Sequence, residues 1–263
     1  MATGVGIKLT GVTFSNPNLP KLIDYKDLIA NSPLCFGAWR FDRDDLVEES
    51  GSGVSRLLSW KDGGPDLEFF AGVNGQATRI SDAALGHKVG RLTANCQYGL
   101  ASGVTWNPTQ AYTIVAVAKV SNYATVARIA GYSASATDRA YVETYTNAAP
   151  APAVRHTRGG AIVGAPVLDA AGYFVAYGSH AGSSDLQQSV QILGGPTSKY
   201  SQAVATDTLT NANTFRIGSS ISTSDVVIDI DFVALFSADL IYQEAELKGH
   251  VDDYLRMRMG IAV

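Results

Sequence analysis

Two aspartates at spacing i, i+2 are the residues of this chain whose types and spacing most resemble a catalytic pair. Asp229 and Asp231 lie in the stretch VVIDIDFVALF, residues 226–236. Residues i and i+2 of a β-strand share a face, and a retaining glycosidase holds its two carboxyl groups about 5–5.5 Å apart. The pair is therefore either the nucleophile and acid–base of a hydrolase or two acidic side chains on the outer face of a structural strand.

The apolar residues of the same stretch favour the structural interpretation. Its even positions are all apolar from Val226 to Phe236, which predicts a row of side chains facing a core between two sheets. The odd positions then face outward, with Val233 and Leu235 available to contact a covering element. We expect the two aspartates to be solvated or capping residues on this outer face, and we predict no catalytic residue.

The end of the chain predicts an α-helix that covers this outer face. Five residues recur at i, i+4, i+7, i+8 and i+11, the spacing of one helical face: Leu247, Val251, Tyr254, Leu255 and Arg258. Gly260 is placed to cap the C-terminus of the helix, and Arg256 suits the negative end of its dipole.

Short strands at regular spacing precede this helix, which is typical of an antiparallel β-sandwich. The stretch AYTIVAVAKV, residues 111–120, is almost continuously apolar and predicts a central strand. Turn-rich spacers separate five further strand patterns, at residues 126–132, 139–145, 172–179, 189–195 and 215–220. The fold class expected is all-β, with two antiparallel sheets and the C-terminal helix packed on one of them.

Composition limits the classes of partner. The chain has 263 residues, a formal net charge of −4 and a pI near 5.5, so it lacks the basic excess with which proteins bind duplex DNA or anionic membranes. The N-terminus has no basic start followed by an apolar run, and no stretch approaches the ~20 apolar residues of a membrane span. We expect no nucleic-acid partner, no membrane partner, and a chain made in a cytoplasm without a signal peptide.

The residues that bind metals give no clear pattern. Four histidines are scattered without the spacing of metal ligands: His87, His156, His180 and His250. Cys35 and Cys96 are expected to be buried thiols, and a single bridge between them stays open. The loop FDRDDL, residues 41–46, is rich in the oxygen ligands that Ca²⁺ prefers, although a solvated loop is the expected structure. We predict no cofactor and no metal.

The C-terminal part resembles the concanavalin A-like, or laminin-G-like, jelly-roll family. The residues that match its F-x-I-G strand, its D-I-A-E-V strand and its Y-L-x-x-x-Y-G-I helix end are Phe215, Ile217, Gly218, Asp229, Ile230, Tyr254, Leu255, Gly260 and Ile261. Phe232 departs from the pattern, which has a glutamate there.

The front half carries the same resemblance. Trp39, Trp60, Lys61 and Asp62 match the family's opening W-x-D-A-x-D and W-x-D-x-S-G motifs, and YTIVAVAKV matches its F-T-I-x-A-V-x-K strand. The resemblance defines a domain at residues 34–263. It implies a two-sheet antiparallel jelly-roll sandwich with the C-terminal helix packed on one sheet.

Residues 1–33 lie outside this resemblance and predict an N-terminal arm. The arm is either an ordinary first strand with its connection or an attachment segment that docks on a neighbouring subunit. Its segment TGVTFSNPNLPKL is similar to N-terminal segments of tailed-bacteriophage virion proteins. The apolar residues expected to form this assembly contact are Val12, Phe14, Leu19, Leu22 and Ile23.

We expect a non-enzymatic structural or adhesion protein of a phage virion, in a tail, fibre or capsid surface, with a lectin-like domain and a homo-oligomeric assembly. The alternative is a carbohydrate-binding module or lectin. A polysaccharide hydrolase or lyase is less favoured, because Ala234 stands where glycoside hydrolases of this fold have the third acid of an E-x-D-x-x-E strand. Host surface glycans would contact exposed aromatic rings, and the candidates are Trp106, Tyr123, Tyr132, Tyr141 and Tyr145. Packing in the core or in an interface is nevertheless the expected role of each ring taken singly.

Overall fold

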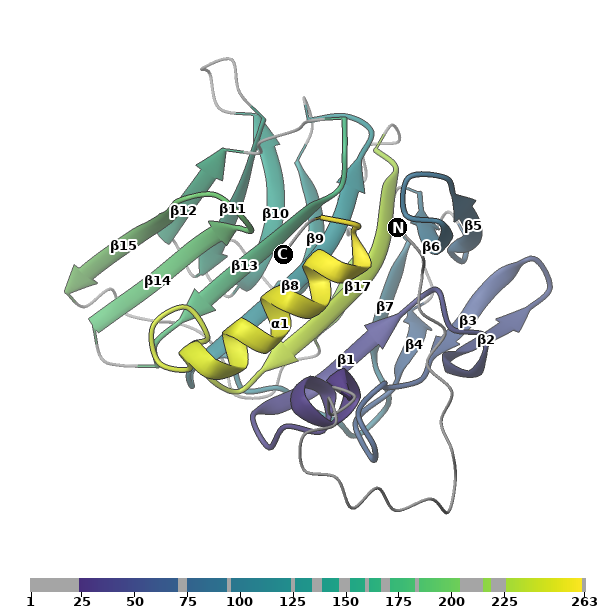
Figure 1. The fold of residues 1–263 in the computed structure, drawn as a ribbon, viewed down its shortest axis with the longest axis horizontal. Coiled ribbons are helices and arrows are strands. Elements are labelled where there is room, and N and C mark those ends of the chain that lie inside the picture. Colours follow the sequence, from purple (N-terminus) through teal and green to yellow (C-terminus); the bar gives the residue numbers. More distant parts are fainter. Residues whose placement is uncertain are drawn as a thin grey trace, which may run out of the picture.

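Two antiparallel β-sheets pack face to face, and a C-terminal helix lies on the outer side of one of them, as the sequence predicts (Figure 1). The computed structural model describes residues 24–70, 75–93, 96–123, 126–133, 139–146, 152–158, 161–166, 171–182, 185–203, 215–218 and 226–261. Within these residues the architecture is the all-β sandwich of the expected class.

The first sheet, sheet A, contains the strands that carry the helix. Its strand order is β15-β14-β13-β8-β17-β6-β5, and β1 also pairs with β17. The bounds are β1 (Cys35–Arg40), β5 (Thr78–Asp82), β6 (His87–Leu92), β8 (Tyr112–Val120), β13 (Phe174–His180), β14 (Asp185–Ile192), β15 (Thr197–Ala203) and β17 (Ile228–Phe236). Strands β8 and β17 are buried on both faces, which explains their nearly continuous apolar sequences.

The second sheet, sheet B, forms the opposite layer of the sandwich. Its strand order is β12-β11-β10-β9-β16-β7-β4-β3-β2. The bounds are β2 (Val47–Ser50), β3 (Gly53–Leu57), β4 (Leu67–Phe70), β7 (Gln97–Leu100), β9 (Ala127–Ser133), β10 (Arg139–Thr146), β11 (Pro152–Arg158), β12 (Ala161–Pro166) and β16 (Arg216–Gly218). In β10, Ala140 and Val142 point into the core, so Tyr141 and Glu143 lie on the outer face of the sheet.

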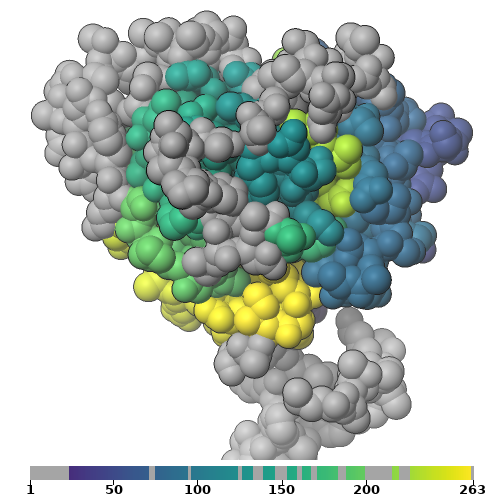
Figure 2. Space-filling view, turned by 90° about the horizontal axis from the view of Figure 1, so that it is seen from above, coloured from purple at the N-terminus to yellow at the C-terminus, as the bar shows by residue number. Residues whose placement is uncertain are grey.

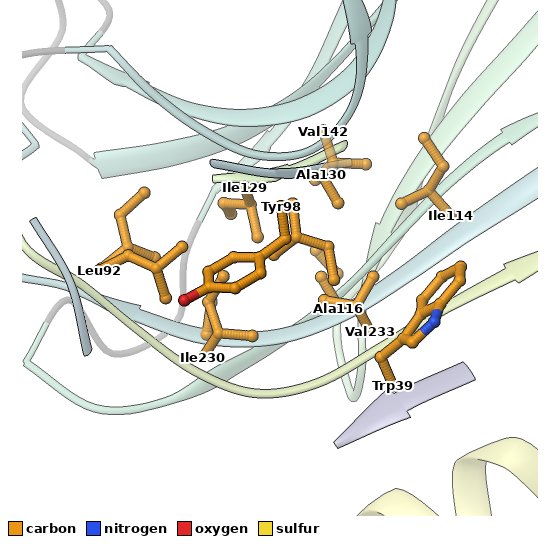
Figure 3. Close-up of a cluster of buried hydrophobic side chains, with 14 of the residues drawn as sticks. Trp39, Leu92, Tyr98, Ile114, Ala116, Ile129, Ala130, Val142, Ile230 and Val233 are labelled. Atoms are coloured by element: carbon orange, nitrogen blue, oxygen red, sulfur yellow. The ribbon is translucent and has the colours of Figure 1, made fainter. Parts of the chain in front are cut away.

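The core between the sheets is built from the inward side chains of both layers. Figure 3 shows Leu92 and Ile230 of sheet A close to Tyr98 and Ile129 of sheet B. The one hydroxyl among these side chains, that of Tyr98, donates a 2.7 Å hydrogen bond to the Val54 carbonyl and accepts one from the Ala77 amide. A large aromatic ring is therefore buried without leaving its polar end unsatisfied.

A second apolar cluster lies between sheet A and the helical segments η1 (Lys26–Ala30) and α1 (Ala245–Arg258). Helix α1 crosses β8, β13 and β17 (Figure 1), and Figure 2 shows it in yellow along one side of the molecule. Its buried residues are Leu247, Val251, Tyr254 and Leu255, which confirms the face predicted from the sequence.

The predicted alternation of β17 holds only for its first half. Ile228 and Ile230 face the core between the sheets, but Val233 and Leu235, expected under the helix, also face that core. Phe232, Ala234 and Phe236 lie under the helix instead. The register between β17 and β8 shifts between Ile230 and Phe232, and such a bulge turns all later side chains to the opposite face.

The C-terminus of α1 ends as predicted at Gly260, whose φ is 66°. The Gly260 amide donates to the Met257 carbonyl at 3.2 Å, and the Ile261 amide donates to the Arg256 carbonyl at 2.9 Å. These are the two hydrogen bonds of a Schellman cap, which favours glycine because the residue that follows the C-cap, here Gly260, is left-handed.

The described end of the predicted arm packs beside α1. Tyr25 lies 5.5 Å from Tyr254 between ring centres, and Ile29 and Ala30 are fully buried. The five assembly residues Val12, Phe14, Leu19, Leu22 and Ile23 lie outside the described residues, so the attachment role of the arm stays a prediction. No helix within the described residues is long and apolar enough to cross a membrane.

Candidate functional site

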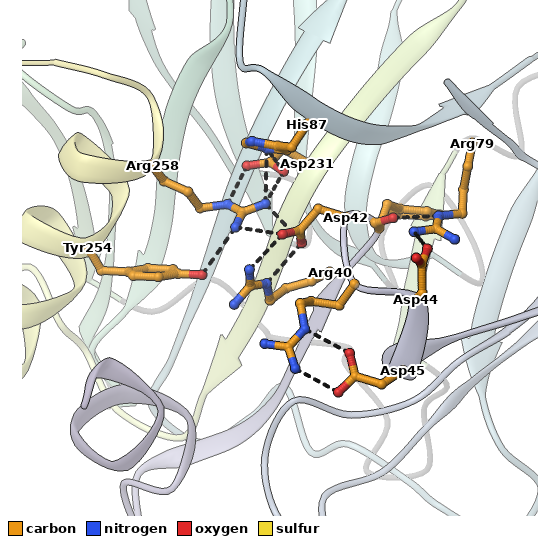
Figure 4. Close-up of polar contacts among 11 residues, drawn as sticks. Arg40, Asp42, Asp44, Asp45, Arg79, His87, Asp231, Tyr254 and Arg258 are labelled. Atoms are coloured by element: carbon orange, nitrogen blue, oxygen red, sulfur yellow. Dashed lines mark hydrogen bonds and ion pairs between the residues drawn. The ribbon is translucent and has the colours of Figure 1, made fainter. Parts of the chain in front are cut away.

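The carboxylate of Asp231 is buried and is held by the end of the C-terminal helix. Arg258, the last residue of α1, donates its Nε–H to Oδ2 at 2.7 Å, and its Nη2 contacts Oδ1. Nε2 of His87 lies 2.8 Å from the same Oδ1. Figure 4 shows both side chains converging on Asp231. Because its side chain is fully buried, Asp231 is not the solvated residue that the sequence allowed.

Arg258 also joins Asp231 to a second aspartate, Asp42, which lies just beyond β1. Its Nη1 donates to Asp42 Oδ2 at 3.2 Å, and Arg40 holds the same carboxylate through a fork of 3.0 and 2.7 Å. Burial acts to raise the pKa of Asp42, but the hydrogen bonds and charges of Arg40 and Arg258 outweigh it and keep that pKa well below its usual range. Two arginines and two aspartates thus balance each other and tie α1 to sheet A (Figure 4).

Asp229 is buried separately and has its own partner. Arg91 of β6 grips it with two hydrogen bonds of 2.8 Å each. A shallow depression of about 260 Å³ lies beside this pair, and its lining residues are Arg91, Lys119, Ser121, Val227 and Asp229. The lining contains one carboxylate, so the arrangement lacks the second acid of a glycosidase. The two aspartates of the opening motif are structural ion-pair residues of the helix-bearing sheet.

The loop considered for Ca²⁺ carries aspartates that are all paired with cations. The pairs are Asp42 with Arg40 and Arg258, Asp44 with Arg79 and Lys88, and Asp45 with Arg43. Within the described part of the chain, no group of three or more histidine, cysteine or acidic side chains is placed to hold a metal ion. The loop is therefore closed by ion pairs and offers no free oxygen cage.

Both cysteines are buried free thiols, so the bridge left open by the sequence is not formed. Burial raises the pKa of the Cys35 and Cys96 thiols to about 12, which keeps them protonated and unreactive. His156 is also fully buried, 2.8 Å from the Tyr112 hydroxyl, and its burial lowers its pKa to about 3.

Four arginines of the described residues lie over aromatic rings on the outer face of sheet B; Arg139 is 5.9 Å from the centre of Tyr141, and the other three are closer to their rings. The distances from guanidinium carbon to ring centre are 4.2 Å for Arg216 on Phe70, 4.6 Å for Arg128 on Tyr141, and 4.5 Å for Arg155 on Tyr145. We call these six residues the arginine–aromatic face. Stacking on a ring orients a guanidinium group and leaves its N–H edges available for a ligand.

Glu143 lies between two of these arginines and can balance the charge of only one of them. It lies opposite Arg128 on β9 and Arg155 on β11. Arg155 Nε hydrogen-bonds to it directly, Arg128 Nε is 3.9 Å away, and Thr157 Oγ1 donates a hydrogen bond of 3.1 Å. Burial raises the pKa of Glu143 above its usual value, although the charge of Arg155 opposes this. One carboxylate therefore serves two guanidinium groups.

A glycine between Arg216 and Tyr141 opens a small hollow in the same face. Gly131 of β9 is opposite both residues in the sheet register. Its φ is +139°, and a Cβ there would lie 2.3 Å from the Ala140 carbonyl oxygen, so no other residue fits. The hollow has a volume of about 20 Å³, enough for one water-sized group. Its lining side chains are Gln97, Arg128, Tyr132, Tyr141 and Arg216.

Arg216 forms no ion pair within the described residues. Its Nη1 donates to Gln97 Oε1 at 3.2 Å, while its Nε is buried and has no hydrogen-bond partner. Burial lowers the pKa of Arg216 from its ordinary value. This end of the arginine–aromatic face thus holds an oriented cation beside an open hollow.

Three of the five predicted glycan-contact residues lie on or beside this face. Tyr141 and Tyr145 belong to it, although Tyr141 is only 2% exposed, and Tyr132 lines the hollow while also packing against the core. The rings of Tyr141 and Tyr145 carry arginines, so the face presents guanidinium groups where bare rings were expected. Whether any of these residues contacts a glycan stays a prediction.

The other two aromatic candidates belong to the core. Trp106 is 3% exposed and packs edge-on against Tyr112 and Phe215, so core packing is confirmed for this ring and it is not an exposed glycan contact. Tyr123 is partly buried and packs against the same core.

The arginines of this face are the residues that the sequence prediction missed. In RAYVETY, residues 139–145, charged and aromatic residues alternate with small or apolar ones, which places Tyr141, Glu143 and Tyr145 on one face. Arg128, Arg155 and Arg216 come from other strands, and their approach depends on a strand order that local pattern does not contain.

No protein-family model and no curated protein matches the chain. Solved structures share its fold: the binding domain of botulinum neurotoxin DC in complex with SialylT has a TM-score of 0.57 and 7% identity over 86% of this chain and 52% of that chain. The binding domain of Paraclostridial Mosquitocidal Protein 1 has a TM-score of 0.54 and 11% identity over 88% of this chain and 53% of that one.

A third structure, the binding domain of botulinum neurotoxin DC in complex with rat synaptotagmin II, has a TM-score of 0.58 and 8% identity over 84% of this chain and 52% of that chain. The chain therefore spans about half the length of the solved chains it matches. At such low identity the similarity establishes the fold, a β-sandwich that also occurs in the binding domains of these toxins, and it assigns no site or ligand.

Proposed function

We propose that this chain is a non-enzymatic carbohydrate-binding domain of the concanavalin A-like type. The observation that carries the proposal is the arginine–aromatic face, because oriented hydrogen-bond donors, apolar rings and a hollow meet there on one surface. Sites for sugars combine aromatic surface with a few fixed polar groups in this way. The two aspartates that could support hydrolysis are each held by an arginine.

The solved structures of the same fold agree with a binding function. Their names describe binding domains, and one states that cell entry of botulinum neurotoxin type C depends on interaction with two ganglioside molecules. These names describe chains about twice as long as the part that matches this chain. They support binding as the general role of the fold, and we infer a glycan ligand from the arginine–aromatic face.

A glycan array probed with the purified chain tests this proposal. We expect the chain to bind bacterial or animal surface glycans on the array, and Arg128→Ala to lose this binding. No sugar should be released from any polysaccharide that the chain binds. Lys119→Ala, in the depression beside Asp229, is the control and should bind as the wild type does. Absence of retention, or loss caused by the control alone, would refute the proposed site.

The biological setting that we propose is a tailed-bacteriophage virion. The domain would be an adhesion component exposed on a tail, fibre or capsid, made in the host cytoplasm and assembled as a homo-oligomer. The similarity of TGVTFSNPNLPKL to virion N-terminal segments supports this setting, as does the position of that segment outside the jelly-roll domain. The partners of the arm would be other virion proteins.

Removing residues 1–23 tests the arm. Because Tyr25 and Ile29 pack in the domain, the shortened chain should fold and keep its glycan binding. Light scattering should then show a smaller assembly than the full chain forms. An assembly of unchanged mass after the deletion would contradict the attachment role.

A further inference from the structure

We propose that the arginine–aromatic face selects acidic sugars, and that Arg216 receives the carboxylate of the bound residue. This inference rests on the proposed carbohydrate-binding function and names the chemical class of its ligand.

The charge of the face is opposite to that of the whole chain. The chain has a net charge of −4, whereas Arg128, Arg155 and Arg216 share this face with the buried Glu143. Glu68 of β4 points to the same side but is exposed and forms no ion pair with Arg216 within the described residues. The arginine–aromatic face therefore attracts anions locally, although the chain as a whole repels them.

Arg216 has the geometry of an unfilled anion site. Phe70 supports one side of its guanidinium group and Gln97 accepts from Nη1, so its orientation is fixed before any ligand arrives. Nε and Nη2 form no hydrogen bond with the described residues. Nε is shielded from solvent, so Nη2 is the donor that a carboxylate oxygen of a ligand can reach, through a charge-assisted hydrogen bond. A half-buried guanidinium without a counter-charge is partly desolvated and unpaired, and a carboxylate would relieve that cost.

The hollow beside Arg216 selects for the size of the inserted group. Its volume of about 20 Å³ accepts one small substituent and excludes a sugar ring. The ring must therefore lie above the face, against Tyr132 and the stacked arginines, with its acidic substituent directed down to Arg216. Glycans without such a substituent leave the guanidinium group unpaired, so their binding is favoured by less free energy.

The floor of the hollow cannot close. Gly131 and Gly218 both have positive φ, and a Cβ at Gly218 would lie 2.1 Å from the Cys96 carbonyl oxygen. The two glycines are held by the backbones of neighbouring strands, so the hollow exists without the ligand. A site that is already formed loses little free energy to rearrangement when it binds.

Titration with paired oligosaccharides tests the inference. Each pair consists of a uronate or sialate oligosaccharide and its methyl ester, which keeps the ring and removes the charge. We expect the acid to bind at least about tenfold more tightly than its ester, because a hydrogen bond to a charged group contributes more free energy than one to a neutral group. In Arg216→Gln the two affinities should become equal, and Arg216→Lys should restore only part of the difference because it lacks the planar fork.

Arg43→Gln is the matched control, since it removes one positive charge from an exposed ion pair on η2 (Asp44–Leu46) and its flank. It should leave the preference for the acid unchanged. Equal binding of acid and ester by the wild type would overturn this inference and leave carbohydrate binding intact. Stronger binding of sulfated than of carboxylated oligosaccharides would also overturn it, and no binding of any glycan would overturn both proposals.

Discussion

Arg258 donates its Nε–H to Oδ2 of Asp231 at 2.7 Å and so fastens the end of α1 to β17. The carboxylate belongs to the residue at which β17 shifts its register against β8. The bulge gives Asp231 a position beside the helix end, while the residues after it turn their rings under the helix. Asp231, one of the two aspartates that most resemble a catalytic pair in the sequence, therefore anchors α1 to sheet A.

Replacing Asp231 with Asn should lower the free energy of unfolding by about 3 kcal/mol, because it leaves Arg258 buried with an incomplete counter-charge. Urea unfolding at pH 7 measures the change. Asp45→Asn removes an exposed carboxylate from its pair with Arg43 and should cost less than about 1 kcal/mol. Equal losses in the two variants would show that the buried network does not fasten the helix.

Buried His156 makes stability fall as the solution is acidified. Burial, with the charges of His180 and Arg158, lowers its pKa to about 3 in the folded chain, against about 6.5 when unfolded. Only the unfolded chain binds this proton between those values, so its contribution is fully present above about pH 6.5 and is lost as the pH falls toward about 3.

Urea unfolding of the wild type and of His156→Gln between pH 7 and pH 5 checks this linkage. The variant should lose less stability per pH unit than the wild type, by up to about 1.4 kcal/mol. His250→Gln, on the partly exposed side of α1, is the control for the loss of an imidazole. Parallel pH profiles of the wild type and His156→Gln would contradict the burial of a neutral ring.

Gly131→Ala should destabilise the domain by about 1–3 kcal/mol, since its backbone conformation disfavours any side chain. The new Cβ would also meet the Ala140 carbonyl oxygen. Gly249→Ala is a glycine control inside α1, where a Cβ meets nothing within 4 Å, and it should stabilise by about 0.5–1 kcal/mol. Thermal unfolding of both variants measures the two opposite effects on stability. A Gly131→Ala variant as stable as the wild type would contradict the rigid floor of the hollow beside Arg216.

Phe70→Ala should weaken the binding of acidic oligosaccharides by about two- to fivefold, because the ring orients Arg216 through a cation–π contact. Phe70 is 47% exposed, so the fold should change little. Met257→Ala removes another exposed apolar side chain, 56% exposed on α1, and should leave the affinity unchanged. Titration calorimetry compares the affinities of Phe70→Ala and Met257→Ala for acidic oligosaccharides. Equal affinities would show that stacking on Phe70 does not orient Arg216 for the ligand.

Much of the fold follows from local sequence pattern. The terminal helix was predictable because its five-residue face and Gly260 cap are consecutive signals along one element. The inner row of β17 was predictable only as far as Ile230, since a bulge leaves no mark in an apolar stretch in which either face can be buried.

The candidate site was less predictable, because its contacts join residues from β4, β9, β10, β11 and β16. Alternation within one strand places Tyr141 and Tyr145 on the outer face of the sheet, although it does not show that Tyr141 is buried beneath arginines. The arginines that cover them depend on strand order, and the hollow depends on Gly131 meeting Arg216 across a strand pair.

The most direct test of the account is an NMR map of a bound acidic oligosaccharide on the isotope-labelled chain. The account predicts amide shift changes centred on β7, β9, β10 and β16, around Gln97, Gly131 and Tyr141, and their disappearance in Arg216→Gln. Changes centred instead on β17 and the depression at Asp229, with the sheet B amides unmoved, would contradict it.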